Sequence, residues 1–324
     1  MEEDRQSLLI LNRNELVTVD DVPQLIRDAG ASFAWEEFFA GVIRNQHTRI
    51  AYQRAVRQFL AWLEPTGTPL NRISPGQVGA YFNQHPGSVP TRKVHLAALR
   101  AYFDLLTTRH QLFLNPATSV RLGRYSVVEG KTPEISREQA RMLLQSIATS
   151  TPVGRRDKAI LATLIYTAAR AGAIAALRVR DFTSDGTQYS LRFLEKGGKS
   201  RSIPVRHDLQ VVLLAALADI GCETLPKEAH LFRTARGRTG LLGDQPLNNI
   251  DICRMVKRRL RDAGLPELYS PHSFRVATVT DLLEQGIPLE DVQYLAGHAD
   301  PRTTRLYDRR QKRVTRNTVE RISI

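Results

Sequence analysis

A small set of cationic, imidazole and phenol side chains could carry out chemistry on an anionic substrate. The set contains two arginines, two histidines, one lysine and one tyrosine, namely Arg170, Lys196, His272, Arg275, His298 and Tyr307. The sequence has no carboxylate cluster, Walker-type glycine loop or metal-ligand spacing beside them. Such a set suits phosphoryl transfer through a covalent enzyme intermediate, because guanidinium groups can hold the non-bridging oxygens while a hydroxyl attacks phosphorus.

Two of these arginines lie in settings that suggest anion binding. Arg170 is surrounded by apolar residues in TLIYTAARAGAIAAL, so part of its stem is expected to be buried. Its guanidinium group would then bind a substrate phosphate. In the simpler alternative, the arginine lies at a helix end and its guanidinium group extends into solvent. His272 and Arg275 in SPHSFRVAT are predicted to lie one turn apart at a helix N-terminus, which is a ready anion site.

The charge balance points to a polyanionic partner. The 324 residues carry 46 Lys and Arg against 33 Asp and Glu, a net charge of +13, although residues 1–30 are net acidic. Excess charge can serve solubility alone, but an arginine-rich body matches the geometry of nucleic-acid phosphates. Only two cysteines occur, no long apolar run is present and the N-terminus is acidic. A cytoplasmic, nucleoid-associated protein without a disulfide framework or membrane anchor is therefore expected.

The elements that must position these residues are predicted to be mainly helical. Residues 1–30 form an N-terminal extension of unclear role, and residues 31–122 show helical periodicity typical of a bundle of four or five helices. Residues 123–134 are interpreted as a linker. Residues 135–324 form an α+β domain that opens with a capping box at Ser136 and contains one small antiparallel sheet.

Within this second domain, three predictions concern the site directly. The apolar stretch RRDKAILATLIYTAARAGAIAALRVRDF is predicted to be helical, and YSLRFLEKGGKSRSIPV to be a β-hairpin turning at Gly197 and Gly198. Lys196 and Lys199 flank that turn, either as an ordinary charged hairpin end or as a finger reaching into a groove. Short helical segments are predicted at 272–285, 289–296 and 301–307. The first carries His272 and the third ends at Tyr307, while His298 lies in the loop between the second and the third.

Basic residues on the first domain are candidates for phosphate contacts. They recur at helix starts and outer faces, and each could instead be part of a solvated helix face. Together with the net charge, a DNA-facing surface is favoured. The residues assigned to DNA binding are Arg44, Arg49, Arg54, Arg92 and Lys93 in the first domain, with Lys199 and Arg201 in the second.

Five short motifs together resemble one known family. They are YTAARAG around Arg170, LEKGGKSRSIPV around Lys196, HSFR from His272, LAGHAD around His298 and TTRLY ending in Tyr307. In order and spacing they are similar to the signature of the tyrosine recombinases, the phage-integrase family. The helical first half is similar to that family's SAM-like core-binding domain, so the resemblance covers residues 34–324.

The resemblance implies a role for each residue at the phosphate. Tyr307 would attack a DNA phosphodiester, form a 3′-phosphotyrosyl link and release a 5′-hydroxyl. Arg170 and Arg275 would stabilise the transition state, and His298 would donate a further hydrogen bond. The phosphotyrosyl link conserves the bond energy, so no metal, ATP or other cofactor is expected.

The resemblance also implies two proton-transfer groups. Lys196 would protonate the departing 5′-oxygen, and His272 would assist proton transfer at the nucleophile. Lys199 is the alternative to Lys196, although position in the motif favours Lys196.

The implied partners are double-stranded DNA and further copies of the same chain. The resemblance implies a dimer on each recombination site and a tetramer that exchanges strands between two sites through a four-way junction. Val314, Val319 and Ile322 form an apolar stripe in the tail, which is expected to pack into a neighbouring subunit. A mobile element is favoured over a plasmid or a chromosome as the setting.

One position departs from the family pattern, and two other functions stay open. Family members usually carry a carboxylate where this chain has Ala173, so Asp181 or a backbone group is expected to support the pocket instead. A type IB topoisomerase uses a similar set of side chains. A DNA-binding regulator that has lost catalysis would retain the same basic surface.

Overall fold

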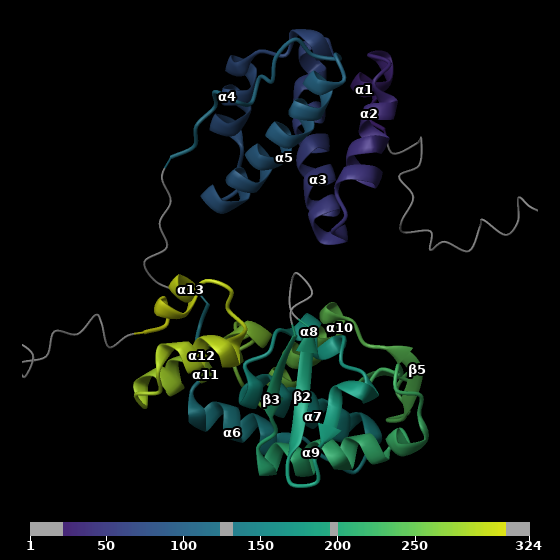
Figure 1. The fold of residues 1–324 in the computed structure, drawn as a ribbon, viewed down its shortest axis with the longest axis vertical. Coiled ribbons are helices and arrows are strands. Elements are labelled where there is room, and N and C mark those ends of the chain that lie inside the picture. Colours follow the sequence, from purple (N-terminus) through teal and green to yellow (C-terminus); the bar gives the residue numbers. More distant parts are fainter. Residues whose placement is uncertain (1–21, 124–131, 195–199, 309–324) are drawn as a thin grey trace, which may run out of the picture. The chain divides into compact units, whose positions relative to one another are not determined.

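The structure is a computed structural model, and it describes residues 22–123, 132–194 and 200–308 (Figure 1). The chain divides between residues 126 and 127 into an N-terminal and a C-terminal unit, each with its own hydrophobic core. The predicted fold class is confirmed: the N-terminal unit is helical, and the C-terminal unit combines helices with small antiparallel sheets. Among the described residues, no helix is long and apolar enough to span a bilayer.

Helices pack around an aromatic core in the N-terminal unit. Its elements are α1 (Gln24–Asp28), α2 (Ser32–Glu36), a π-helical turn (Glu37–Val42), α3 (Gln46–Leu63), 3-10 turns (Glu64–Thr66 and Leu70–Arg72), α4 (Pro75–Gln84) and α5 (Val89–Thr108). The side chain of Asn45 caps α3 by accepting from the Thr48 N–H at 3.0 Å. Trp35 packs against Phe39 and Tyr102, with ring centroids 4.4 and 5.6 Å away.

Part of the segment assigned to an N-terminal extension belongs to this core. Val22 and Ile26 are buried among the same apolar residues as the longer helices. Ile26 lies in α1 and is fully buried. Residues 22–30 therefore contribute packing to the helical unit.

The C-terminal unit surrounds a small sheet with helices. Its helical elements are α6 (Arg137–Ser146), α7 (Pro152–Thr167), α8 (Ala171–Ala175), a 3-10 turn (Val179–Asp181), α9 (His207–Ala218), a 3-10 turn (Cys222–Thr224), α10 (Asn249–Asp262), α11 (Pro271–Glu284), α12 (Leu289–Ala296) and α13 (Pro301–Arg305). The predicted capping box is confirmed, because Ser136 and Gln139 exchange side-chain and backbone hydrogen bonds at the start of α6. In Figure 1, α11, α12 and α13 lie together on one side of β2 and β3.

The strands form two separate antiparallel sheets. β1 (Phe182–Ser184), β2 (Tyr189–Leu194) and β3 (Ser200–Pro204) pair in that order, and β4 (Arg233–Ala235) pairs with β5 (Leu242–Pro246). The predicted antiparallel strand pair is confirmed as β2 and β3. The predicted turn at Gly197 and Gly198 lies outside the described residues. The β4–β5 sheet was not predicted, because its strands are short, polar and irregular in register.

The prediction of one continuous helical stretch through Arg170 was wrong. α7 ends at Thr167, and α8 begins only at Ala171. Ala168 between them is left-handed, with φ 50° and ψ 23°, a conformation that costs a residue with a Cβ about 1 kcal/mol or more. The break has no glycine or proline signal. It is held from elsewhere in the fold, because Arg275 of α11 donates to the Ala168 carbonyl.

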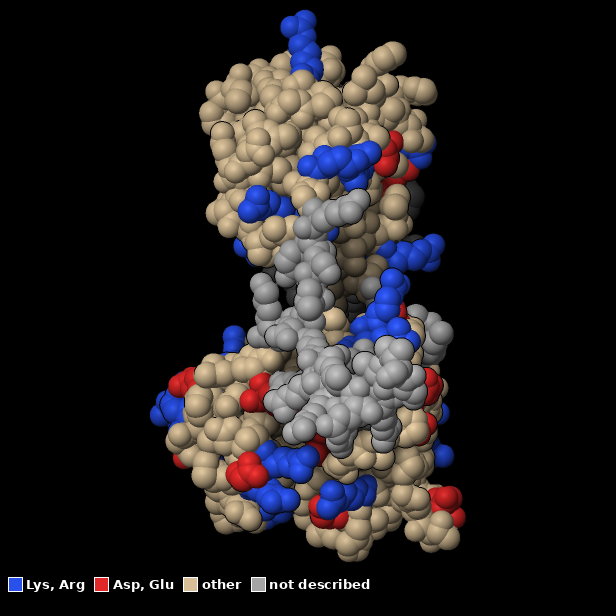
Figure 2. All heavy atoms as spheres, turned by 90° about the vertical axis from the view of Figure 1, so that its left-hand side faces the viewer, with Lys and Arg blue, Asp and Glu red and all other residues tan. Residues whose placement is uncertain are grey.

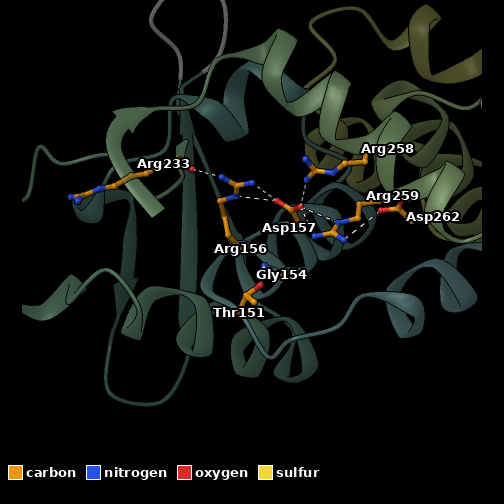
Figure 3. Close-up of polar contacts among 8 residues, drawn as sticks. All are labelled: Thr151, Gly154, Arg156, Asp157, Arg233, Arg258, Arg259 and Asp262. Carbon is orange, nitrogen blue, oxygen red and sulfur yellow. Dashed lines mark hydrogen bonds and ion pairs between the residues drawn. The ribbon is translucent and has the colours of Figure 1, made fainter. Parts of the chain in front are cut away.

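A buried ion cluster joins α7 to α10. Figure 3 shows Arg156, Arg258 and Arg259 converging on the Asp157 carboxylate, which is 0% exposed. The three N···O distances are 2.6, 2.6 and 2.8 Å. Arg156 also donates to the Arg233 carbonyl of β4 at 2.6 Å. Asp157 and Arg156 together therefore connect two helices and a strand.

Candidate active site

Tyr307 lies in the turn that follows α13. Asp300 caps this short helix by accepting from the Arg302 N–H at 2.9 Å. At the other end, the Tyr307 N–H donates to the Thr304 carbonyl at 3.0 Å. These local bonds fix the tyrosine backbone, and its half-buried ring packs against a small apolar core that contains Ala168 and Val279.

Two histidines from different elements meet at the tyrosine. The Tyr307 hydroxyl lies 3.4 Å from Nε2 of His272, near the start of α11. The His298 ring is parallel to the phenol ring, with the centroids 5.9 Å apart and an interplanar angle of 5°. His298 follows α12, so the start of α11 and the turn after α12 both meet the phenol.

Both arginines of the predicted set are held by backbone carbonyls. Arg275 is 1% exposed, and its Nη1 donates to the Ala168 carbonyl at 2.5 Å. The Arg170 Nη1 donates to the Gly297 carbonyl at 3.3 Å. Arg170 was expected to be partly buried, but it caps α8 and is exposed. The helix break at Ala168 moves it out of the apolar stretch.

His298 is fixed on every side. It is 7% exposed, and its Nδ1 lies 2.9 Å from the Thr304 hydroxyl. Its backbone N–H donates to the Gln293 carbonyl at 3.1 Å, and the Gln293 side chain donates to the His298 carbonyl at 3.0 Å. Burial, followed by the positive charges of Arg275 and Arg170, lowers the pKa of His298 to about 3. The imidazole is therefore neutral at pH 7.

The electrostatics hold the tyrosine and His272 in their neutral forms as well. Burial raises the pKa of Tyr307 above its ordinary value of 10.0, and Arg275 and Arg170 oppose that effect. Partial shielding from water, followed by the same two arginines, lowers the pKa of His272. A neutral imidazole facing a neutral phenol can accept the phenol proton when an anion-binding pocket stabilises the transition state.

The remaining predicted catalytic positions lie in different settings. Lys196 and Lys199 lie outside the described residues. Asp181 does not stand in for the carboxylate expected at Ala173, because Arg192 and the Arg178 backbone N–H occupy it at 3.1 and 3.0 Å. The carbonyls on Arg170 and Arg275 fit the alternative of a backbone group. Within the described residues, no cluster of His, Cys, Asp and Glu is arranged to hold a metal.

The residues assigned to DNA binding divide into two groups. Arg44, Arg54 and Lys93 are exposed. Arg49 donates to the Ile43 carbonyl at 3.0 Å, and Arg92 to the Gly87 carbonyl at 2.9 Å. On the face drawn in Figure 2, the Lys and Arg side chains of the N-terminal unit are scattered rather than gathered in one patch.

Arg201, which the sequence assigned to DNA binding, lies in a buried position. Arg201 is 4% exposed on the inner face of β3, and its guanidinium lies over the Phe193 ring at 4.9 Å. Its Nη1 donates to the Leu295 carbonyl at the end of α12. The available signal was the period of two in SRSIP, which places Arg201 on the same strand face as Ile203.

Sequence reasoning missed the residues that hold the predicted set in place. Thr304 is fully buried beside His298. Gln293 forms hydrogen bonds with both the N–H and the carbonyl of His298. Gly297 is left-handed at φ 61°, which ends α12 and turns the chain to His298. The glycine before His298 and the paired threonines of TTRLY were the only local signals for this arrangement.

Comparisons with known proteins agree on one family. A model of the phage integrase family matches residues 134–313, and one of its N-terminal SAM-like domain matches residues 36–110. The tyrosine recombinase XerC of Pelobacter propionicus is 29% identical over 274 residues, which cover 81% of this chain and 84% of that protein. XerD of Listeria monocytogenes is 26% identical over 275 residues, covering 81% and 88%.

Solved structures share the fold. XerH bound to palindromic difH substrate in a post-cleavage complex has a TM-score of 0.67 at 20% identity, covering 96% of this chain and 88% of that one. A lambda integrase dimer bound to a COC′ core site has a TM-score of 0.61 at 17% identity, covering 87% and 94%. With more than half of its length matched by the family model, the chain belongs to the phage integrase family of tyrosine recombinases.

Proposed function

We propose that the protein is a site-specific DNA recombinase that cleaves and rejoins DNA through a 3′-phosphotyrosyl intermediate. The observation that carries this proposal is the 3.4 Å approach of the Tyr307 hydroxyl to His272 Nε2, beside His298 and Arg275. These groups supply a nucleophile, a proton acceptor and cationic stabilisation at one point. Family membership adds that such proteins are DNA cleavage and rejoining enzymes.

In the cleavage step, the Tyr307 oxygen attacks phosphorus while its proton passes to His272. A bond forms between phosphorus and the phenolic oxygen, and the bond from phosphorus to the 5′-oxygen breaks. Lys196 gives its proton to that 5′-oxygen, so a 5′-hydroxyl leaves. Reversal of these steps with a different 5′-hydroxyl rejoins the strand.

The pocket contributes by binding the phosphate oxygens as their charge grows. Arg170 and Arg275 are cations already oriented by the Gly297 and Ala168 carbonyls. The Nδ1 atom of neutral His298 can accept a hydrogen bond from the Thr304 hydroxyl, which leaves Nε2–H as a donor to the phosphate. Loss of either arginine should slow cleavage roughly 100- to 1000-fold.

The proposed partners are double-stranded DNA and other copies of this chain. Related solved structures are described as a lambda integrase dimer on a core site and a lambda integrase tetramer on a Holliday junction. By analogy, this chain binds each site as a dimer and joins two sites as a tetramer. It would act on cytoplasmic DNA as a nucleoid-associated protein, and a mobile element is the favoured setting.

The proposal is tested with a nicked suicide DNA substrate that carries the recombination site found by footprinting. Wild-type protein should accumulate a covalent protein–DNA adduct, and Tyr307→Phe should form none while binding DNA equally well. Absence of an adduct from the wild type would favour a DNA-binding regulator. Relaxation of plasmids that lack the site would favour a type IB topoisomerase.

The assignment of Lys196 is tested with a 5′-bridging phosphorothiolate substrate, whose leaving group needs no proton. Lys196→Ala should cleave ordinary DNA slowly and this substrate at nearly the wild-type rate. Lys199→Ala is the matched control from the same turn. Rescue of Lys199→Ala alone would transfer the acid role to Lys199.

The tetramer is tested by removing residues 314–324, which lie outside the described residues. The shortened protein should bind a single site but fail to pair two sites in a synapsis assay. Recombination at the wild-type rate would contradict the proposed role of the tail.

A further inference from the structure

Arg201 occupies an unusual place for a charged residue. β3 alternates exposed and buried residues, and Arg201 takes a buried position on the same face as Ile203. It is directly opposite Phe193 of β2 in the strand register, and its guanidinium lies over that ring at 4.9 Å. Burial of a guanidinium is costly unless it satisfies polar groups elsewhere.

The polar group that Arg201 reaches belongs to the end of α12. Its Nη1 donates to the carbonyl of Leu295, one of the last four carbonyls of that helix. The end of a helix carries partial negative charge, which a guanidinium complements. Other bonds fix the same stretch, since the Gly297 N–H donates to the Tyr294 carbonyl and the His298 N–H to the Gln293 carbonyl.

We infer that Arg201 is a positioning residue that ties the β2–β3 hairpin to the turn presenting His298. The hairpin turn carries Lys196, the proposed acid, and the turn after α12 carries His298 and the carbonyl that holds Arg170. One guanidinium thus links β3, which follows the hairpin turn, to the residues next to His298. This inference rests on the proposed function and replaces DNA contact as the role of Arg201.

The positive charge of Arg201 has a second effect in the same place. It is one of the cations that lower the pKa of His298, after burial, Arg275, Arg170 and His272. Arg201 therefore favours both the position and the neutral form of this imidazole.

The first test measures the local structure without DNA. Hydrogen exchange of the Gly297 and His298 amides should be faster in Arg201→Met than in the wild type, because the end of α12 loses its anchor. Arg180→Met is the matched control, since Arg180 forms an exposed ion pair with Glu228 in the same unit. Unchanged exchange in Arg201→Met would overturn the inference, whether or not the protein proves to be a recombinase.

The second test measures chemistry separately from binding. Arg201→Met should slow adduct formation on the suicide substrate about a hundredfold with unchanged DNA affinity and salt dependence, and Arg201→Lys should recover part of the rate. In a His298→Gln background, Arg201→Met should reduce the rate of adduct formation by a smaller factor than it does in the wild type. The reason is that both substitutions act through the same imidazole. Reduced affinity with a normal rate at saturating DNA would instead make Arg201 a DNA-contact residue. If the wild type formed no adduct, the proposed function would be rejected. The hydrogen-exchange measurement would then determine by itself whether Arg201 positions the end of α12.

Discussion

At the residue scale, the site combines fixed cations with neutral imidazoles. Arg275 is buried and His298 is nearly so, and each has a hydrogen-bond partner that fixes its direction. Burial, followed by the charges of Arg275 and Arg170, lowers the pKa of both imidazoles and makes their protonation unfavourable. The free site is thus arranged to receive negative charge, which a phosphate brings.

Neutral His298 should make stability fall in acid. Its pKa is lowered from the ordinary 6.5 to about 3, first by burial. The unfolded chain therefore takes up this proton near pH 6.5, whereas the folded chain does so only near pH 3. The free energy of unfolding is then highest above pH 6.5 and decreases as the pH falls toward 3.

Urea unfolding at several pH values checks this expectation. His298→Gln should lose less stability than the wild type between pH 7 and pH 5, because it lacks the group that titrates. His207→Gln, which changes an exposed histidine, is the matched comparison. An unaltered pH dependence in His298→Gln would show that other groups cause the loss in acid.

At the element scale, the helix break before α8 and the cluster at Asp157 determine where the arginines lie. α7 carries Asp157 near its start and ends at Thr167, just before Ala168, whose carbonyl orients Arg275. α10 packs on both α7 and α8, and the α8 N-terminus presents Arg170. The joint between α7 and α10 therefore supports the part of the site that binds anions.

Loss of the Asp157 charge should destabilise this joint strongly. In Asp157→Asn, three arginines lose their shared carboxylate in a buried setting, and we expect a loss of about 3–5 kcal/mol in the free energy of unfolding. Glu228→Gln is the matched control, because Glu228 pairs with Arg178 and Arg180 but is 56% exposed. Its loss should be at most about 1 kcal/mol. Equal losses in urea unfolding would contradict the importance of burial.

The start of α7 also requires a glycine at position 154. A Cβ there would lie 2.0 Å from the Ala148 carbonyl oxygen, so the backbone must shift. Gly154→Ala should destabilise the protein by about 1–3 kcal/mol. Gly79→Ala in α4 meets no atom within 4 Å, and it should stabilise by roughly 0.5–1 kcal/mol because alanine favours a helix. Denaturant unfolding distinguishes the two signs, and a stabilised Gly154→Ala would contradict the contact.

At the scale of the whole molecule, the net charge of +13 should make DNA binding depend strongly on salt. Arg54→Gln and Lys93→Gln each remove an exposed cation and should each lower the log–log salt slope by about 0.9. Arg92→Gln is the comparison, since the Gly87 carbonyl already occupies that guanidinium, and its slope should change little. Affinity measured across a salt series checks all three, and a full change in slope for Arg92→Gln alone would reverse the assignment.

The sequence by itself determined the class of chemistry, the mainly helical fold and the β2–β3 hairpin. The class of chemistry could be predicted from residue types and spacing because each residue lies in a short motif. These residues are Arg170, His272, Arg275, His298 and Tyr307. Periodicity and capping were sufficient for most helices because those signals are local, as at Ser136.

Only the tertiary structure decided how these residues are held. The left-handed Ala168 depends on Arg275 more than a hundred residues later, and buried Arg201 depends on a carbonyl ninety-four residues away. The irregular β4–β5 sheet carries too little local pattern to be recognised. In each case a backbone group is hydrogen-bonded to a residue far away in the sequence. The local sequence shows the type of each residue but does not show which distant residue it will contact.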